Sequence, residues 1–205
     1  MIVDYLEPYR EASKEHGGSF YATLWRSREG QQLRFNMMCK GIDFSGTSIL
    51  DVGCGLGDFA DFLLTQQIPF SSFHGIDAME QMISEAEHKL LPRCTFSIGD
   101  VVEKAQLLKG FDWITMSGTL NAMPQNIAMK LVSNAFSACN IGVAYNFLSN
   151  QCKQNIQEDL TPASRFETIK MLEQAFQLTR NVNFDQSYLD GHDATIILKK
   201  CNIEN

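Results

Sequence analysis

The chain has 205 residues, of which 44% are hydrophobic and 20% are charged. This size and composition suit one globular domain and exclude a disordered, collagen-like or coiled-coil protein. The net charge of −7 argues against a nucleic-acid partner, because phosphate backbones are bound through clustered Lys and Arg.

The sequence also indicates where the protein works. No apolar run reaches the ~20 residues needed to cross a bilayer, and the N-terminus lacks the basic start of a secretory signal. We therefore expect no membrane partner and a cytoplasmic location. The 6 cysteines are widely spaced, so we expect reduced thiols, and none has the spacing of a zinc site. Nothing in the sequence assigns an oligomeric state.

Strand-like and helix-like segments alternate along the chain. Apolar runs predict strands at residues 48–52, 72–77, 94–98, 111–117, 142–148, 182–188 and 194–199. Helical spacing predicts helices at residues 6–16, 29–40, 58–67, 79–90 and 126–138. A last helix is expected from a capping box, with Ser164 at the N-cap and Glu167 at N3, to about residue 178. Its buried stripe is expected to be Phe166, Ile169, Leu172 and Phe176.

This alternation predicts an α/β fold with a mostly parallel sheet that is covered on both faces. Residues 189–192 are too short for a crossover helix, so the last two strands should be antiparallel. The first two helices are expected over the carboxyl edge of the sheet. We expect one domain over residues 1–205, with a helical cover at 1–46 and an α/β core at 47–205.

A glycine-rich turn follows the first strand. Gly53, Gly55 and Gly57 allow a tight turn and a close approach of the backbone to a ligand. In open α/β sheets, ligands bind outside the carboxyl ends of the strands. A dinucleotide fingerprint would need its third glycine where this chain has Asp58. A carboxylate there also suits a ligand without phosphate, although the glycines alone are compatible with a turn that binds nothing.

Acidic residues lie at the ends of the first three strands. Asp77 lies about 20 residues beyond the glycines, where an acid accepts hydrogen bonds from ribose hydroxyls. Asp100 can accept a hydrogen bond from an adenine amino group. Asp51 lies at the end of the first strand. Each of these acids alone is also compatible with a structural role, in capping a helix or in forming a turn. Together they favour a cationic adenosine ligand such as S-adenosylmethionine over NAD.

The segments DVGCGLGDF, GID, SIGDV and FDWITMSGTLN resemble, in order and spacing, the motifs of class I S-adenosylmethionine-dependent methyltransferases. The resemblance implies a Rossmann-like, doubly wound sheet of seven strands in the order 3-2-1-4-5-7-6, with the seventh antiparallel. Residues 16–35 and 188–195 also resemble a group of small bacterial methyltransferases of this class without a firmly assigned substrate.

The resemblance also implies roles for individual residues. Backbone groups at Gly53 and Gly55 would hold the methionine part of the cofactor above Asp51, and Asp77 would hold the ribose. Met79, Asp100 and Val101 would contact the adenine, and Ser117 and Gly118 would border the sulfur. The expected cofactor-binding residues are Trp25, Arg34, Asp51, Gly53, Cys54, Gly55, Asp77, Ala78, Met79, Asp100, Val101, Ser117 and Gly118.

Three side chains outside these motifs complete the predicted site. Arg34 is expected to pair in bidentate fashion with the methionine carboxylate, and Trp25 is expected to cover the pocket, although either is equally compatible with a purely structural position. His192 is the candidate general base, because histidine titrates near neutrality, with a turn histidine as the alternative. Further polar candidates near strand ends are Asn121, Tyr145 and Asn146.

These residues favour a methyltransferase that acts on an unidentified small-molecule acceptor. Asn121-Ala122-Met123-Pro124 lacks the Asn/Asp-Pro-Pro-aromatic sequence of enzymes that methylate amino groups of nucleic acids. Two alternatives stay open: a non-catalytic regulatory protein that binds S-adenosylmethionine and, less favoured, an NAD-dependent oxidoreductase.

Overall fold

The computed structural model describes residues 4–152 and 161–201. Its strands are β1 (Ser48–Val52), β2 (Ser72–Asp77), β3 (Cys94–Ile98), β4 (Trp113–Met116), β5 (Gly142–Leu148), β6 (Asn181–Asp185) and β7 (Asp193–Lys199). The α-helices are α1 (Glu7–His16), α2 (Arg28–Cys39), α3 (Asp58–Thr65), α4 (Glu80–His88), α5 (Gln125–Ala138) and α6 (Thr168–Leu178). Short 3₁₀ turns are η1 (Phe20–Thr23), η2 (Ala105–Leu108) and η3 (Leu189–Gly191).

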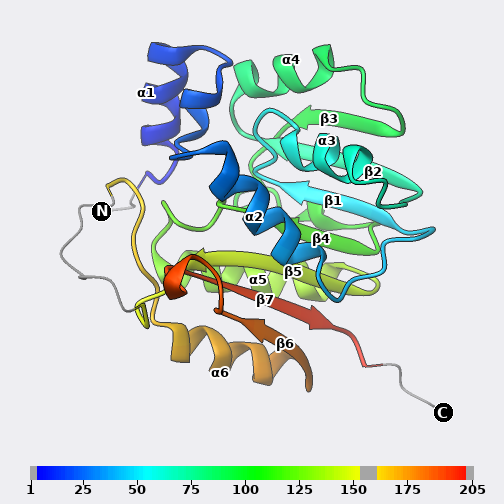
Figure 1. Ribbon diagram of the computed structural model, residues 1–205, viewed down its shortest axis with the longest axis vertical. Helices are drawn as coiled ribbons and strands as arrows, with labels where there is room; N and C mark the ends of the chain where they lie inside the picture. Colours follow the sequence, from blue (N-terminus) through cyan, green and yellow to red (C-terminus); the bar gives the residue numbers. More distant parts are fainter. Residues whose placement is uncertain (1–3, 153–160, 202–205) are drawn as a thin grey trace.

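All seven strands form one sheet in the order β3-β2-β1-β4-β5-β7-β6 (Figure 1). β7 runs antiparallel to both of its neighbours, and the other pairs are parallel. The predicted fold class and strand order are therefore confirmed. β1, β2, β3 and β5 have the predicted bounds, because glycines, Pro69 and short polar turns mark their ends.

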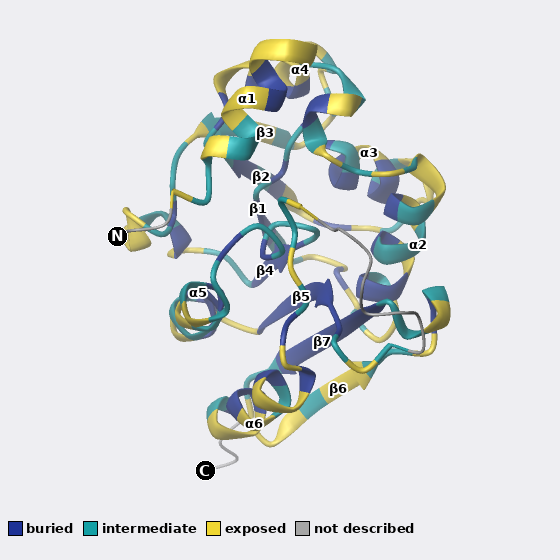
Figure 2. Ribbon diagram, turned by 90° about the vertical axis from the view of Figure 1, so that its left-hand side faces the viewer, coloured by how far each residue is buried: buried dark blue, intermediate teal, exposed yellow. Residues whose placement is uncertain are grey.

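Helices cover both faces of the sheet (Figure 2). On one face, Phe35 and Met38 of α2 and Phe59 of α3 pack against Ile49 and Trp113 of the sheet. On the other face, apolar residues of α5 and α6 pack against β4, β5 and β7. Every residue of β5 is buried, as expected for a strand in the centre of a sheet with two covered faces.

Two expectations about helices were wrong. α6 begins at Thr168, and its N-cap Glu167 makes no side-chain capping bond. The backbone N–H of Ser164 instead donates to Asn121 O at 2.9 Å. Phe166 lies before the helix in a bridge with Ser149, which shifts the buried face of α6 to Thr168, Met171, Gln174 and Ala175. Ile169 and Phe176 of the expected stripe are exposed.

The second correction concerns the N-terminal helices. Most of α2 lies on a face of the sheet beside α3 rather than over its carboxyl edge. Phe35, Met37 and Met38 form a buried apolar side of this helix, which packs against the sheet. α1 and η1 lie against that edge, where Leu6, Tyr9 and Ala22 pack on Leu56 and Met79, and only the start of α2 reaches it. Among the described residues, no helix has the length and apolar character needed to span a membrane.

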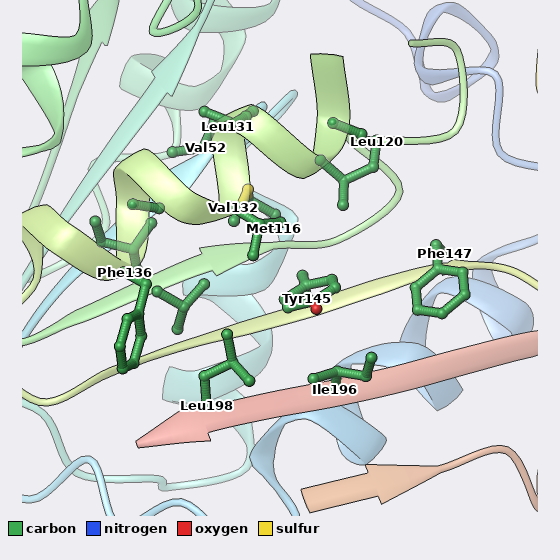
Figure 3. Close-up of a cluster of buried hydrophobic side chains, with 14 of the residues drawn as sticks. Val52, Met116, Leu120, Leu131, Val132, Phe136, Tyr145, Phe147, Ile196 and Leu198 are labelled. Atoms are coloured by element: carbon green, nitrogen blue, oxygen red, sulfur yellow. The ribbon is translucent and has the colours of Figure 1, made fainter. Parts of the chain in front are cut away.

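The core contains a buried hydroxyl without a partner. Tyr145 of β5 is fully buried, and its neighbours in the sheet are Met116 on β4 and Ile196 on β7 (Figure 3). Its hydroxyl has no hydrogen-bond partner among the described residues, and burial raises its pKa. Tyr145 was a polar candidate for the site, and this position excludes that role.

We expect Tyr145→Phe to leave the free energy of unfolding unchanged or to raise it by about 1 kcal/mol, because it removes an unsatisfied buried hydroxyl. Tyr188→Phe is the matched control, since the Tyr188 hydroxyl lies 2.6 Å from Thr195 Oγ1 in a buried pair. The control should lower that free energy by about 1–2 kcal/mol. Urea denaturation measures both values, and an equal loss in the two variants would contradict the assignment.

Candidate functional site

A cavity of about 600 Å³ opens at the carboxyl edge of the sheet. In Figure 1 the arrowheads of β1, β3 and β5 point to this side of the molecule, where α1 also lies. The loops that follow β1 to β4 line it, together with α1, η1, the start of α2 and the turn before β7. Every expected cofactor-binding residue lines this cavity, and so does His192.

The glycine turn after β1 forms one wall. Gly53 and Gly55 have φ values of 68° and 51°, which residues with a Cβ rarely adopt. A Cβ on Gly53 would lie 2.7 Å from Thr119 Cγ2, whereas one on Gly55 would meet only Thr23, at 3.7 Å. Packing therefore explains the glycine at position 53, and Gly55 leaves its backbone open to the cavity.

Asp77 holds this turn in place. Its Oδ2 accepts from the Gly55 N–H at 2.9 Å, and its Oδ1 accepts from the Met79 N–H at 2.9 Å. Burial raises the pKa of Asp77, and the backbone donors act in the opposite direction. A carboxylate has about four acceptor sites, and the backbone N–H groups of Met79, Gly55 and Ala78 act on this one, so one site is left for a ribose hydroxyl of the kind that the sequence predicted there.

Asp51 is the most deeply buried acid of the cavity. It is 3% exposed, and its Oδ1 accepts from Thr115 Oγ1 at 2.7 Å. The pKa of Asp51 is raised to about 7, mainly by burial and in smaller part by the nearby charge of Asp77, against the lowering effect of the Thr115 bond. A cation beside this carboxylate would therefore be stabilised by it.

Asp100 has a partner that the sequence did not reveal. The Tyr5 hydroxyl donates to Asp100 Oδ2 at 2.6 Å, and the Val102 N–H donates to Oδ1 at 2.8 Å. The pKa of Tyr5 is raised by burial and by this hydrogen bond. Tyr5 precedes α1 in a stretch without a motif, so no sequence signal pointed to it. It closes the cavity at the edge expected to receive the adenine.

Asp58, at the start of α3, is neutralised within the protein. Lys89 Nζ donates to Asp58 Oδ1 at 2.6 Å, and Gln31 Nε2 donates to Oδ2 at 3.2 Å. Its charge is therefore compensated locally, in contrast to that of Asp77 and Asp51.

The loop after β4 is held by a buried amide. Asn146 is fully buried on β5. Its Nδ2 donates to Ser117 Oγ at 2.9 Å, and its Oδ1 accepts from the Gly118 N–H at 2.8 Å. A Cβ on Gly118 would lie 2.6 Å from Trp25 Cζ2, so the indole packs directly on this glycine. Trp25 thus lies over the loop that was expected to border the reacting sulfur.

Arg34 lines the cavity, but its bidentate partner differs from the expected one. Its Nε and Nη2 donate to the two carboxylate oxygens of Asp193 at 2.6 Å and 2.5 Å, and Asp193 is fully buried. Its Nη1 donates to Gly30 O at 3.0 Å. The bidentate pairing that was expected with the methionine carboxylate is therefore made with Asp193. One N–H on each of Nη1 and Nη2 is left for a ligand.

His192 also lines the cavity, in an arrangement that does not suit a general base. Arg165 Nη2 lies 2.9 Å from His192 Nδ1. Arginine only donates hydrogen bonds, so Nδ1 is the acceptor and the neutral ring carries its proton on Nε2. The lone pair of Nδ1 is thus already used, which argues against the base role expected for His192.

The comparisons with known proteins agree with this architecture. A model of the methyltransferase domain family matches residues 49–142. No curated protein sequence matches this chain. Among solved structures, magnesium protoporphyrin IX methyltransferase from Synechocystis PCC 6803, with bound SAH, is 17% identical, has a TM-score of 0.68 and covers 97% of both chains.

Two further solved structures are similar to this chain. A SAM-dependent methyltransferase from Archaeoglobus fulgidus is 19% identical with a TM-score of 0.66, over 85% of this chain and 95% of that one. The methyltransferase domain of a bacterial Hen1 protein is 17% identical with a TM-score of 0.64, over 83% of this chain and 99% of that one.

The matched segment contains the glycine turn, the acids that end β2 and β3, and the loop after β4. A methyltransferase domain is thus matched over residues 49–142, and the fold is that of solved SAM-dependent methyltransferases. The residues of the cavity fit S-adenosylmethionine as a cofactor, because Asp51 and Asp77 are buried acceptors without a cationic partner among the described residues. When bound, S-adenosylmethionine supplies a methyl group on a sulfonium cation.

The raised pKa of Asp51 predicts a pH-dependent affinity of the methyltransferase for S-adenosylmethionine. A bound cation stabilises the carboxylate, so binding releases a proton wherever Asp51 is protonated in the free protein. The affinity should therefore fall below pH 7, to about one tenth at pH 6 of its value at pH 7.5. Calorimetric titration at several pH values measures this change.

The control is Asp51→Asn, which keeps an oxygen acceptor for Thr115 and removes the titration. This variant should bind more weakly at pH 7.5, with an affinity that changes less than twofold between pH 6 and pH 7.5. Equal affinities of the native methyltransferase at the two pH values would contradict the assignment.

Proposed function

We propose that this methyltransferase transfers its methyl group to a small molecule bound in the same cavity as the cofactor. The shape of the cavity is the observation that carries the proposal. Its volume of about 600 Å³ lies within the range of about 300–1,000 Å³ that is typical of small-molecule sites. α1, η1 and the start of α2 cover the cavity, which favours a small acceptor over a large one.

The proposed cofactor contacts follow the sheet edge. Asp77 receives the ribose, and Asp100 with Val101 borders the adenine. The backbone of Gly53 to Gly55, above Asp51, receives the methionine part. The protein's own contribution is to hold these groups in place and to exclude water. Asn146 contributes by holding the loop of Ser117 and Gly118 against Trp25.

A nucleic-acid acceptor is the competing candidate, because a bacterial Hen1 methyltransferase domain shares the fold, as does a solved small RNA methyltransferase. The net charge of −7 argues against it, since neutralising phosphates takes clustered Lys and Arg. Transfer assays with RNA, DNA and small-molecule extracts, read by radiolabelled methyl groups, distinguish the two. Label in macromolecular RNA or DNA alone would overturn the small-molecule proposal.

Calorimetry with Asp77→Asn tests the cofactor site. We expect this variant to bind S-adenosylmethionine at least tenfold more weakly than the native protein, because it weakens charge-assisted hydrogen bonds of about 1.5–3 kcal/mol. Asp61→Asn, on the exposed side of α3, is the matched control and should bind normally. An unchanged affinity in Asp77→Asn would show that the cofactor does not reach this carboxylate.

The same titrations separate the remaining alternatives. Binding of S-adenosylmethionine without transfer to any of a broad set of acceptors would favour a regulatory protein. Binding of NAD in place of S-adenosylmethionine would favour an oxidoreductase.

A further inference from the structure

Two tyrosines at the beginning of the chain line the cavity. Tyr5 and Tyr9 are four residues apart, just before and within α1. The Tyr5 hydroxyl donates to Asp100 Oδ2 at 2.6 Å, so its donor is used within the protein. The Tyr9 hydroxyl makes no hydrogen bond to another residue in the part of the chain that the structure describes. Tyr9 therefore brings an unused donor and acceptor to the cavity.

Tyr9 lies beside the end of β2. It packs in the apolar cluster that contains Ala78 and Met79, the two residues that follow Asp77 in the chain. Among the described members of that cluster, Tyr9 alone has a hydroxyl. Burial and, to a smaller extent, the negative charge of Asp77 raise the pKa of Tyr9 to about 12. The hydroxyl is thus close enough to interact with that carboxylate, and it stays protonated at neutral pH, so it can donate as well as accept.

The carboxylate of Asp77 has too few free acceptor sites to bind a ribose alone. The backbone N–H groups of Gly55, Ala78 and Met79 act on it, which leaves about one of its four acceptor sites. A ribose with free 2′ and 3′ hydroxyls carries two donors. One hydroxyl can therefore donate to Asp77, and the other needs a second partner, because a hydroxyl that loses water without gaining a hydrogen bond weakens binding.

The other hydroxyls on this side of the cavity are already used as donors. The Tyr5 hydroxyl donates to Asp100, and Thr23 Oγ1 on η1 donates to Phe20 O at 2.6 Å. Of the cavity-lining hydroxyls that the structure describes before the start of α2, only that of Tyr9 keeps its donor for a ligand.

We infer that Tyr9 is a cofactor-binding residue whose hydroxyl holds the ribose hydroxyl that Asp77 does not receive. The two tyrosines then support acids at neighbouring strand ends, with Tyr5 at Asp100 after β3 and Tyr9 at Asp77 on β2. α1 thereby contributes to the affinity and selectivity for the nucleoside, in addition to covering the cavity. This inference rests on the proposed function, because it adds a residue to the proposed cofactor site.

Calorimetric titration with three forms of the demethylated cofactor tests the inference. The probes are S-adenosylhomocysteine and its 2′-deoxy and 3′-deoxy analogues, none of which carries a methyl group to transfer. Tyr9→Phe should bind S-adenosylhomocysteine about fivefold more weakly than the native protein, because it loses one neutral hydrogen bond. This difference should shrink to less than twofold for the analogue that lacks the hydroxyl held by Tyr9.

Two results would overturn the inference. One is an equal affinity of Tyr9→Phe and of the native protein for S-adenosylhomocysteine. The other is a loss of the same size with S-adenosylhomocysteine and with both analogues, since that loss would come from the packing of the ring and not from its hydroxyl. Tyr21→Phe is the matched control, because Tyr21 is 72% exposed on η1, and it should bind all three probes as the native protein does.

A crystal structure of the native protein with S-adenosylhomocysteine gives a second measurement, which does not depend on the stability of a variant. We expect the Tyr9 hydroxyl within about 3.2 Å of a ribose oxygen, and a distance beyond about 3.6 Å from both ribose hydroxyls would overturn the inference. If the native protein binds neither S-adenosylmethionine nor S-adenosylhomocysteine, the proposed function fails and the inference with it. If it binds both and Tyr9→Phe behaves as the native protein, only the inference about Tyr9 fails.

Discussion

The architecture of the cavity depends on the carboxylate of Asp77. It joins the end of β2 to two turns at once, through the Gly55 N–H and the Met79 N–H, each at 2.9 Å. The glycine turn has no side chains of its own to fix its path, so this carboxylate determines where its backbone lies. Burial disfavours the charged form of Asp77, and the backbone N–H groups of Met79, Gly55 and Ala78 partly offset that penalty. A bound ligand that donates further hydrogen bonds completes the compensation.

The two ends of the cavity differ in how their charges are treated. Near β1 and β2 the protein leaves Asp51 and Asp77 without cations, which matches a sulfonium ligand. Near β5 and β7, Arg165 donates to Ser149 O, His192 O and His192 Nδ1, none of which carries a formal negative charge. Two other carboxylates are compensated by cations of the protein itself: Lys89 pairs with Asp58, and Arg34 pairs with Asp193.

Much of the fold was predictable from the sequence, because each strand near the site ends in a glycine or an acid. The ends of β1, β2 and β3 were predicted to the residue, and the acids at these ends do line one cavity. Contacts between distant segments were not predictable. Arg34 pairs with a residue 159 positions away, and Tyr5 with one 95 positions away. The start of α6 was missed because the bridge between Ser149 and Phe166 overrides a local capping pattern.

The pairing of Arg34 with Asp193 has a consequence for how molecules enter and leave. It ties α2, near the beginning of the chain, to the first residue of β7, and breaking it would leave a fully buried carboxylate without compensation. Within the described residues, α1 is held at the same edge by apolar packing and by the hydrogen bond from Tyr5 to Asp100. Opening on the α1 side would therefore require less free energy than opening on the α2 side, so a bound molecule would exchange more readily past Tyr5 and Asp100.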